Sequence, residues 1–340
     1  ISQVRIDKGT QKAENPKTGD AWVIRCVGTN ASGNDCGTIT EAANAVDSDI
    51  ILVADGTSLD LSGESLALPE DAILSNGGNA PNLDTPYGTA DLGDIYGAGN
   101  ANNRPAIIGG TLTVASDSAI AGFDFTNVSI TNRSTSHVRI QNNTFTGSPN
   151  GEGAIVFDGA NDVLIAGNTI TNPTTSALEG DPNGSLIGRG IAVTNGNNIQ
   201  ITGNTISGAT AEAIYVENIG TSTNNVISNN VVSGMRASED SNLEAGIFVR
   251  NDTDGYIAIT GNTVKDNNLT SGVGFPVDRG TNSTDGIELN ICRGGVNLSD
   301  DAFTDGVAGA CTTNATLTAV IDQNIVSNLN GGADGIDTNI

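Results

Sequence analysis

A short phrase with asparagine at a fixed position recurs along the chain and constrains the fold more than any other feature. Its clearest form is Ile-x-x-Asn-Thr-Ile, with β-branched or aromatic residues on either side of the asparagine. Repeats of this kind are typical of solenoids, in which each repeat packs only against its neighbours. Copies begin at Ile140, Ile165, Ile201, Ile227, Ile259 and Ile321, and a degenerate copy begins at Ile120.

A second phrase, typically Gly-Ile-x-Val, alternates with the first. Both are short β-branched runs that end at Asn, Asp or Gly, which predicts strands separated by turns. The asparagine recurs after 25, 36, 26, 32 and 62 residues, whereas one coil needs only roughly 20 to 25 residues. We therefore expect loop insertions, mostly between the first phrase and the second, and these project from one face. They are residues 173–188, 235–245 and 268–285.

The recurring asparagines are interpreted as structural. A buried amide is costly without hydrogen-bond partners, and stacked asparagines supply such partners from coil to coil. The flanking Ile, Val and Phe side chains are predicted to fill the interior. We expect no catalytic role for the members of this ladder, which include Asn143, Asn168, Asn204, Asn230 and Asn262.

The first 105 residues lack the clean repeat and are predicted to form an N-terminal cap with the first coils, followed by the repeats of residues 106–340. Residues 38–46 indicate a short amphipathic helix with a hydroxyl cap, and residues 49–53 indicate a buried strand. Such a helix would cover an open sheet edge. The chain starts at Ile1 and ends just after the opening of a new coil, so we expect a processed or excised piece.

The formal net charge is −25. A field of that sign repels phosphate backbones, which argues against nucleic acid as a partner. It also repels polyanionic glycans unless a divalent cation bridges them. No window approaches the roughly 20 apolar residues of a membrane span.

The four cysteines form two local pairs, Cys26 with Cys36 and Cys292 with Cys311. Neither spacing suits zinc, and the chain has one histidine, so loop-closing disulfides in an oxidising compartment are the better interpretation. Four cysteines allow three pairings, and spacing alone does not choose among them.

Two stretches of sequence resemble a known superfamily. Gly-Thr-Ile-Thr-Glu-Ala at 37–42 and Asp-Ile-Ile-Leu-Val-Ala-Asp-Gly-Thr at 49–57 resemble the start of pectate-lyase-like right-handed parallel β-helix proteins. The later Ile-x-x-Asn-Thr-Ile units resemble the parallel β-helix repeats of the same proteins. Residues 66–69, 104–108, 112–114 and 120–123 are similar to β-helical regions of bacterial surface and autotransporter-like proteins. The resemblance implies an all-β right-handed parallel β-helix with a short N-terminal capping helix. It leaves function open, because this fold hosts lyases, hydrolases, epimerases, adhesins and fibres.

If the chain is a lyase, the resemblance implies a cationic base beside carboxylates that hold Ca²⁺. Arg279, Lys265 and Asp285 are then the catalytic candidates, although surface cations are usually only solvated. A glycosidase of the polygalacturonase kind is suggested by residues 284–287 and 333–336 and by the pair Asp300-Asp301, but the first two phrases follow from the repeat itself. The Gly-His-Gly phrase of that group is absent, because His137 stands in Ser-His-Val.

One column of acidic residues suggests a metal site. Residues just before the second phrase would lie about 4.8 Å apart on successive coils. Unpaired like charges at that spacing favour a bound Ca²⁺, although a solvated turn edge is the simpler alternative. The column comprises Glu212, Glu244, Asp285 and Asp334, with Arg189 in the same phase.

We therefore predict a non-enzymatic extracellular or cell-surface protein, either an adhesin or a subunit of an extracellular fibre or coat. Its predicted partners are other copies of itself or a polysaccharide. The alternative is a Ca²⁺-dependent polysaccharide lyase or glycoside hydrolase on the same fold.

Overall fold

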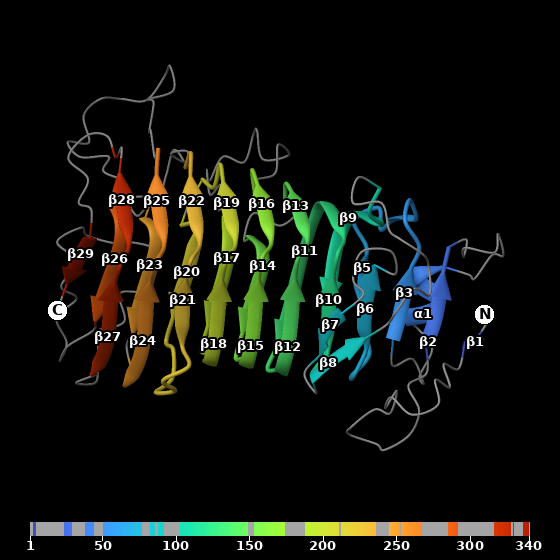
Figure 1. Ribbon diagram of the computed structural model, residues 1–340, viewed down its shortest axis with the longest axis horizontal. Helices are drawn as coiled ribbons and strands as arrows, with labels where there is room; N and C mark the ends of the chain where they lie inside the picture. Colours follow the sequence, from blue (N-terminus) through green and yellow to red (C-terminus); the bar gives the residue numbers. More distant parts are fainter. Residues whose placement is uncertain are drawn as a thin grey trace.

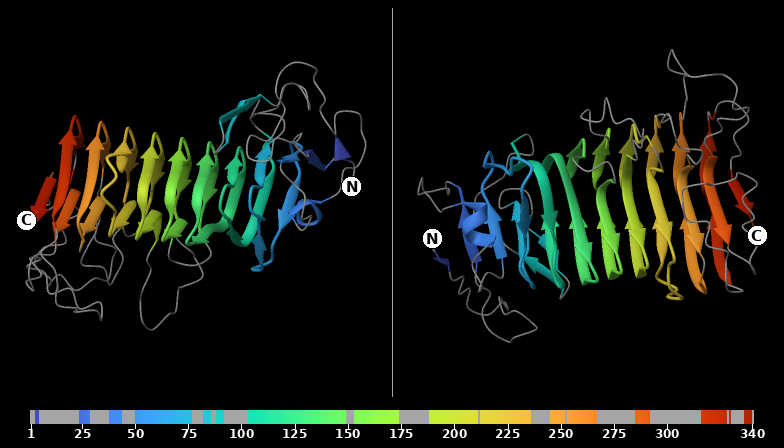
Figure 2. Two further views of the ribbon diagram at one scale, coloured as in Figure 1. Left: turned by 90° about the horizontal axis from the view of Figure 1, so that it is seen from below. Right: turned by 180° about the vertical axis from the view of Figure 1, so that it is seen from behind.

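The chain winds into one elongated stack of coils that runs from the N-terminus to the C-terminus of the computed structural model (Figure 1). The strands of successive coils lie side by side, and the views from below and behind show the same regular stacking (Figure 2). The structure describes residues 3–4, 24–28, 38–43, 50–76, 82–85, 88–91, 103–148, 153–173, 188–210, 212–235, 245–251, 253–266, 285–291, 316–327, 329 and 336–339.

One side of the stack, face 1, is an 11-stranded sheet of the described residues, and all its strand pairs are parallel except β1 with β2. Its strands, in spatial order, are β1 (Gln3–Val4), β2 (Ile24–Val27), β3 (Ile50–Val53), β6 (Ile73–Asn76), β10 (Ala119–Ala121), β12 (Ser136–Gln141), β15 (Asn161–Ala166), β18 (Asn197–Thr202), β21 (Val226–Ser228), β24 (Gly255–Thr260) and β27 (Leu317–Asp322).

The other two sides belong to one 16-stranded sheet of the described residues. Face 2 holds the short strands β13 (Thr144–Thr146), β16 (Thr169–Thr171), β19 (Thr205–Ser207), β22 (Val231–Ser233), β25 (Thr263–Lys265) and β28 (Ile325–Ser327). Face 3 holds β14 (Gly153–Asp158), β17 (Arg189–Thr194), β20 (Ile214–Glu217), β23 (Ala245–Asn251), β26 (Asp285–Ile291) and β29 (Ile336–Asn339). The long strands β9 (Ala106–Thr113) and β11 (Asp124–Arg133) run through both faces, and β4 (Ser58–Asp60) and β5 (Ser65–Ala67) pair with β9.

The predicted asparagine ladder is confirmed between faces 1 and 2. From Asn168 onward, each ladder Oδ1 accepts from the backbone N–H and the Nδ2 of the preceding member, at 2.9–3.1 Å. The Oδ1 of the first member, Asn143, accepts from the Phe123 N–H at 3.0 Å. Each Nδ2 also donates to a backbone carbonyl of the preceding coil, as Asn204 does to Ile165 at 2.9 Å. These bonds satisfy amides that are buried from Asn143 to Asn262. The members are Asn143, Asn168, Asn204, Asn230, Asn262 and Asn324.

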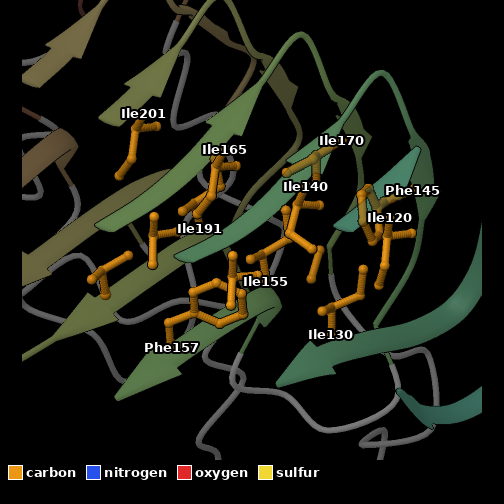
Figure 3. Packing of buried hydrophobic residues seen from close by; sticks show 14 of the residues in the cluster. Ile120, Ile130, Ile140, Phe145, Ile155, Phe157, Ile165, Ile170, Ile191 and Ile201 are labelled. Carbon is orange, nitrogen blue, oxygen red and sulfur yellow. The ribbon is translucent and has the colours of Figure 1, made fainter. Parts of the chain in front are cut away.

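The core is a set of apolar columns that run along the axis inside the coils. Ile120, Ile140, Ile165 and Ile201 occupy equivalent positions on face 1 and are fully buried (Figure 3). Phe125 and Phe145 stack across face 2 with ring centroids 4.8 Å apart. Because the strand period is two, the intervening residues point outward, and each face can carry its own surface chemistry.

The predicted N-terminal helix and strand are both confirmed, and the described helix is the short α1 (Ile39–Ala43). Thr38 and Glu41 form a capping box, in which Glu41 N–H donates to Thr38 Oγ1 and Thr38 N–H donates to Glu41 Oε2. A hairpin of β7 (Asn82–Thr85) and β8 (Gly88–Asp91) forms a separate two-stranded sheet.

Candidate functional site

One outward column of face 3 changes chemistry along the solenoid. Strand pairing places one residue from each coil in this column, between two buried positions of its strand. Neighbouring members are therefore separated by about one strand spacing, ~4.8 Å. From the N-terminal side the face 3 column reads Thr113, Thr131, Val156, Ala192, Tyr215, Phe248 and Glu288.

At the middle of this column, Tyr215 and Phe248 stack with Arg189, a residue beside the column. The three side chains come from three consecutive coils. The guanidinium carbon of Arg189 lies 4.0 Å from the ring centroid of Tyr215. The ring of Phe248, from the following coil, lies parallel to that of Tyr215 with centroids 5.5 Å apart. Both faces of the Tyr215 ring are therefore occupied, so the ring is not free to stack on a sugar.

Ion pairs and a hydrogen bond hold this stack in place. Arg189 Nε donates to Glu212 Oε2 at 2.7 Å, and the Glu212 side chain is only 4% exposed. The phenol of Tyr215 donates to Glu217 at 2.7 Å, and Arg250 Nε lies 3.9 Å from the other oxygen of Glu217. Burial, and then the hydrogen bond and charge of Glu217, raise the pKa of Tyr215 well above its usual range. Tyr215 is therefore a neutral hydrogen-bond donor at physiological pH.

The N-terminal part of the same face is hollowed. A pocket of about 690 Å³ lies over β9, β11 and β14, and Thr113, Thr131 and Val156 of the face 3 column line it. Most of its other lining residues also bear hydroxyl or carboxylate groups, among them Thr111, Ser116, Glu70 and Asp158. None of the lining residues is Lys or Arg.

Asp158 is fixed at the edge of this pocket by the next coil. Its Oδ1 accepts from Thr194 Oγ1 and from Asn195 Nδ2, both at 2.9 Å. Donors to a carboxylate favour its ionised form. The pocket thus presents a positioned anion beside rows of hydroxyls.

A charged ladder that the sequence did not reveal lies at the turn between faces 3 and 1. Asp117 Oδ1 lies 3.1 Å from His137 Nδ1, and Asp162 Oδ2 lies 3.4 Å from His137 Nε2. Arg139 also contacts Asp162, at 3.3 Å. Asp117, His137 and Asp162 share a positive φ of 54–61°, so the same turn conformation on three coils aligns them. No repeat phrase marks these positions, and only the positive φ brings the histidine between two carboxylates.

The structure resolves part of the predicted acidic column. Glu212 is buried and paired with Arg189, which supplies a counter-charge from the protein itself. The register pairs Ala245 with Asp285, so Ala245 stands beside Asp285 at this position of the preceding coil. Glu244 and Asp334 lie outside the described residues. Within the part of the chain that the structure describes, no three His, Cys, Asp or Glu residues gather as metal ligands, and Ca²⁺ binding remains a prediction.

The other predicted residues remain untested. Lys265 ends β25 and Asp285 begins β26, on either side of residues 267–284, and that segment, including Arg279, lies outside the described residues. Cys26 lies in β2. Its three potential disulfide partners lie outside the described residues, and they are Cys36, Cys292 and Cys311.

The sequence matches the family model described as "Right handed beta helix region" over residues 107–284, more than half of the chain. The chain belongs to this right-handed β-helix family. The predicted fold and family are thereby confirmed, and the resemblance to right-handed β-helix proteins is correct. No curated protein matches the sequence. Among the described residues, no helix has the length and apolarity needed to cross a membrane.

Three solved β-helix structures are similar to this family member. An alginate lyase from Paenibacillus sp. str. FPU-7 is 16% identical, with a TM-score of 0.49 over 92% of this chain and 99% of the other. A mutant of the periplasmic alginate epimerase AlgG is 14% identical, with a TM-score of 0.33 over 84% and 75%. The Streptococcus pneumoniae surface protein and adhesin PfbA is 11% identical, with a TM-score of 0.29 over 88% and 94%. Identities this low reflect fold alone.

Proposed function

We propose that this protein is a non-enzymatic extracellular surface protein that binds a neutral polysaccharide in the face 3 pocket. The observation that carries the proposal is the pocket itself, a hollow of about 690 Å³ lined mainly by hydroxyl and carboxylate groups. Sugar hydroxyls both donate and accept, so they suit Thr and Ser hydroxyls and an ionised carboxylate such as Asp158.

The charges of the site favour a neutral glycan. Glu70 and Asp158 line the pocket, no lining residue is cationic, and the whole chain carries a net charge of −25. A uronate or sulfate group would find no counter-charge among the lining residues. Farther along face 3, the cations Arg189 and Arg250 are paired with Glu212 and Glu217.

Binding is tested by titrating the full chain with soluble neutral and acidic polysaccharides in a calorimeter. Thr131→Trp places a large ring in the pocket from an outward, half-buried position. We expect this variant to bind the preferred neutral glycan at least tenfold more weakly, whereas Thr260→Trp, on the outer surface of face 1, binds like the wild type. Equal binding by both variants, or binding of acidic glycans alone, would refute the proposal.

One observation favours a hydrolytic alternative, namely that two carboxyl groups, Glu70 and Asp158, line the same pocket. Glycosidases usually cleave with a pair of carboxyl groups that flank the bond. Release of reducing ends from the bound glycan tests this alternative, with Glu70→Gln and Asp158→Asn as variants. Turnover that both variants abolish, with binding retained, would replace the non-enzymatic proposal. Adding and chelating Ca²⁺ in this assay tests the predicted calcium requirement.

A further inference from the structure

Face 2 carries a regular array of hydroxyl groups. Four of its short strands, β13, β16, β19 and β22, point their first and third residues outward and bury the middle one. In β13, β16, β19 and β22 the eight outward residues are five threonines, two serines and one valine. Strand pairing aligns them in two columns, which together form the hydroxyl array. Its members are Thr144, Thr169, Thr205 and Val231 in one column, and Thr146, Thr171, Ser207 and Ser233 in the other.

The array is uncharged and accessible. Thr146, Thr169 and Thr205 are exposed, and the other members are partly exposed. Within the described part of the chain, the hydroxyls of these three threonines have no hydrogen-bond partner in the protein. On face 1, by contrast, Ser228 donates to Thr202 across neighbouring coils at 3.0 Å. Thr144 differs, because its hydroxyl accepts from the guanidinium of Arg104 at 3.4 Å. The hydroxyls of Thr146, Thr169 and Thr205 are therefore the ones available to an external partner.

Strand propensity alone does not explain the uniform composition. Threonine suits the outer surface of a sheet, but face 1 of the same coils does not use it uniformly. The outward positions of β15 and β18 there include Leu164, Ala166 and Gln200. The uniform stretch covers four consecutive coils, and the same two columns continue into Asp124 on the N-terminal side and Lys265 on the C-terminal side. Within these four coils the composition indicates a requirement specific to face 2.

The array is also rigid and evenly spaced. Neighbouring strands lie about 4.8 Å apart, and the two columns lie about 6.6 Å apart along each strand. A ladder asparagine directly precedes each strand and fixes it through buried hydrogen bonds. Beneath the array, Phe145, Ile170, Ile206 and Val232 are fully buried. The hydroxyl positions thus form a small two-dimensional lattice held from below.

We propose that the hydroxyl array is an ice-binding surface. Ice presents water oxygens in flat layers with spacings close to those of the array, so hydroxyls and methyls on this lattice can hold first-shell water in an ice-like arrangement. A charged side chain would instead organise water around itself, and the array has none. A crystalline polysaccharide also offers a hydroxyl lattice, but sugar rings are commonly recognised by aromatic stacking, and the eight outward positions hold no aromatic residue.

The test is the growth of single ice crystals in a solution of the purified full chain, observed with a nanolitre osmometer. We expect a measurable gap between melting and freezing temperatures and faceted crystals. Thr169→Lys and Thr205→Lys each place a charge in the middle of the array and should remove most of the gap. Thr260→Lys makes the same change on face 1 and should keep the gap. Circular dichroism melting of all variants confirms that they are folded.

Round, freely growing crystals with no freezing gap for the wild type would overturn the proposal. An equal loss of the gap in Thr260→Lys would also overturn it, because the effect would then not belong to face 2. Sedimentation with crystalline cellulose and chitin provides the other comparison. Binding to either solid that Thr169→Lys abolishes, without any effect on ice, would assign the array to a polysaccharide surface and not to ice.

Discussion

Replacing a central ladder asparagine, Asn204→Ala, should destabilise the protein strongly and locally. The Asn204 side chain is fully buried, and its Oδ1 accepts from the N–H and Nδ2 of Asn168, both at 3.0 Å. Its Nδ2 donates to the Ile165 carbonyl at 2.9 Å and to Asn230 Oδ1 at 3.0 Å. The Nδ2 group also donates to the Thr202 carbonyl at 3.2 Å. Alanine removes all five bonds and leaves the Asn168 N–H facing a space without an acceptor. Lost bonds and stranded polar groups of this kind together cost roughly 3–5 kcal/mol.

The last described member of the ladder provides the matched control. Asn324 accepts from Asn262 and donates to the Ile259 carbonyl, but it is partly exposed, so water can replace its bonds. Asn324→Ala should therefore cost only about 1–2 kcal/mol. The comparison holds the chemical change constant and varies burial and position in the ladder.

Hydrogen exchange measured by mass spectrometry is the appropriate assay, because coils of a solenoid can open separately. In Asn204→Ala, peptides that contain Asn168 should lose about a hundredfold or more of their protection, since 1.4 kcal/mol corresponds to a factor of ten. Peptides from β10 and β12 should change less. If Asn204→Ala and Asn324→Ala lower protection equally, the ladder does not stabilise the coils through its buried amide bonds, and the reasoning fails.

Three further predictions concern the side-chain stacks and are checked by urea unfolding. The unfolded chain loses the Tyr215 phenolic proton above about pH 10, whereas the folded chain keeps it because the pKa of Tyr215 is raised. Above about pH 10 the free energy of unfolding should therefore fall by up to ~1.4 kcal/mol per pH unit. The fall should be smaller in Tyr215→Phe. A pH profile unchanged in that variant would contradict this. Arg189→Met leaves the buried carboxylate of Glu212 without its partner and should cost about 3 kcal/mol of stability. The further change Glu212→Leu should restore most of that loss. If stability does not recover, the loss does not come from the unpaired carboxylate. Phe145→Ala should cost roughly 3–5 kcal/mol through the cavity beside Phe125, and a loss below 1 kcal/mol would mean that the coils collapse to fill it.

Sequence reasoning succeeded for features that repeat with the period of the coil. The ladder asparagines and the buried isoleucines recur in every copy, because each coil must satisfy the same interior. The hydroxyl cap of the N-terminal helix was also predicted, and Thr38 supplies it to the N–H of Glu41, three residues away. Local patterns of this kind report local geometry directly.

Most of the candidate site could not be predicted from the sequence. Its contacts depend on the register between coils, and the coils carry insertions of different length. Glu212 was placed in the acidic column, but its ion pair with Arg189 depends on coils that differ in length. Tyr215 and Phe248 lie in copies of the second phrase, and only strand pairing shows that both point outward and meet. The pocket was not predicted at all, because Glu70 reaches it from a different coil from Asp158.

The contrast between faces 2 and 3 bears on how one fold carries two surfaces. On both faces the outward positions are free of the constraints that fix the core, because successive side chains of a strand point to opposite sides. Face 3 changes from threonine through alanine to tyrosine and phenylalanine within a few coils, as a site for a discrete ligand would. Face 2 keeps threonine or serine at seven of eight consecutive positions. A partner that itself repeats from coil to coil accounts for that uniformity, whereas a single bound molecule does not.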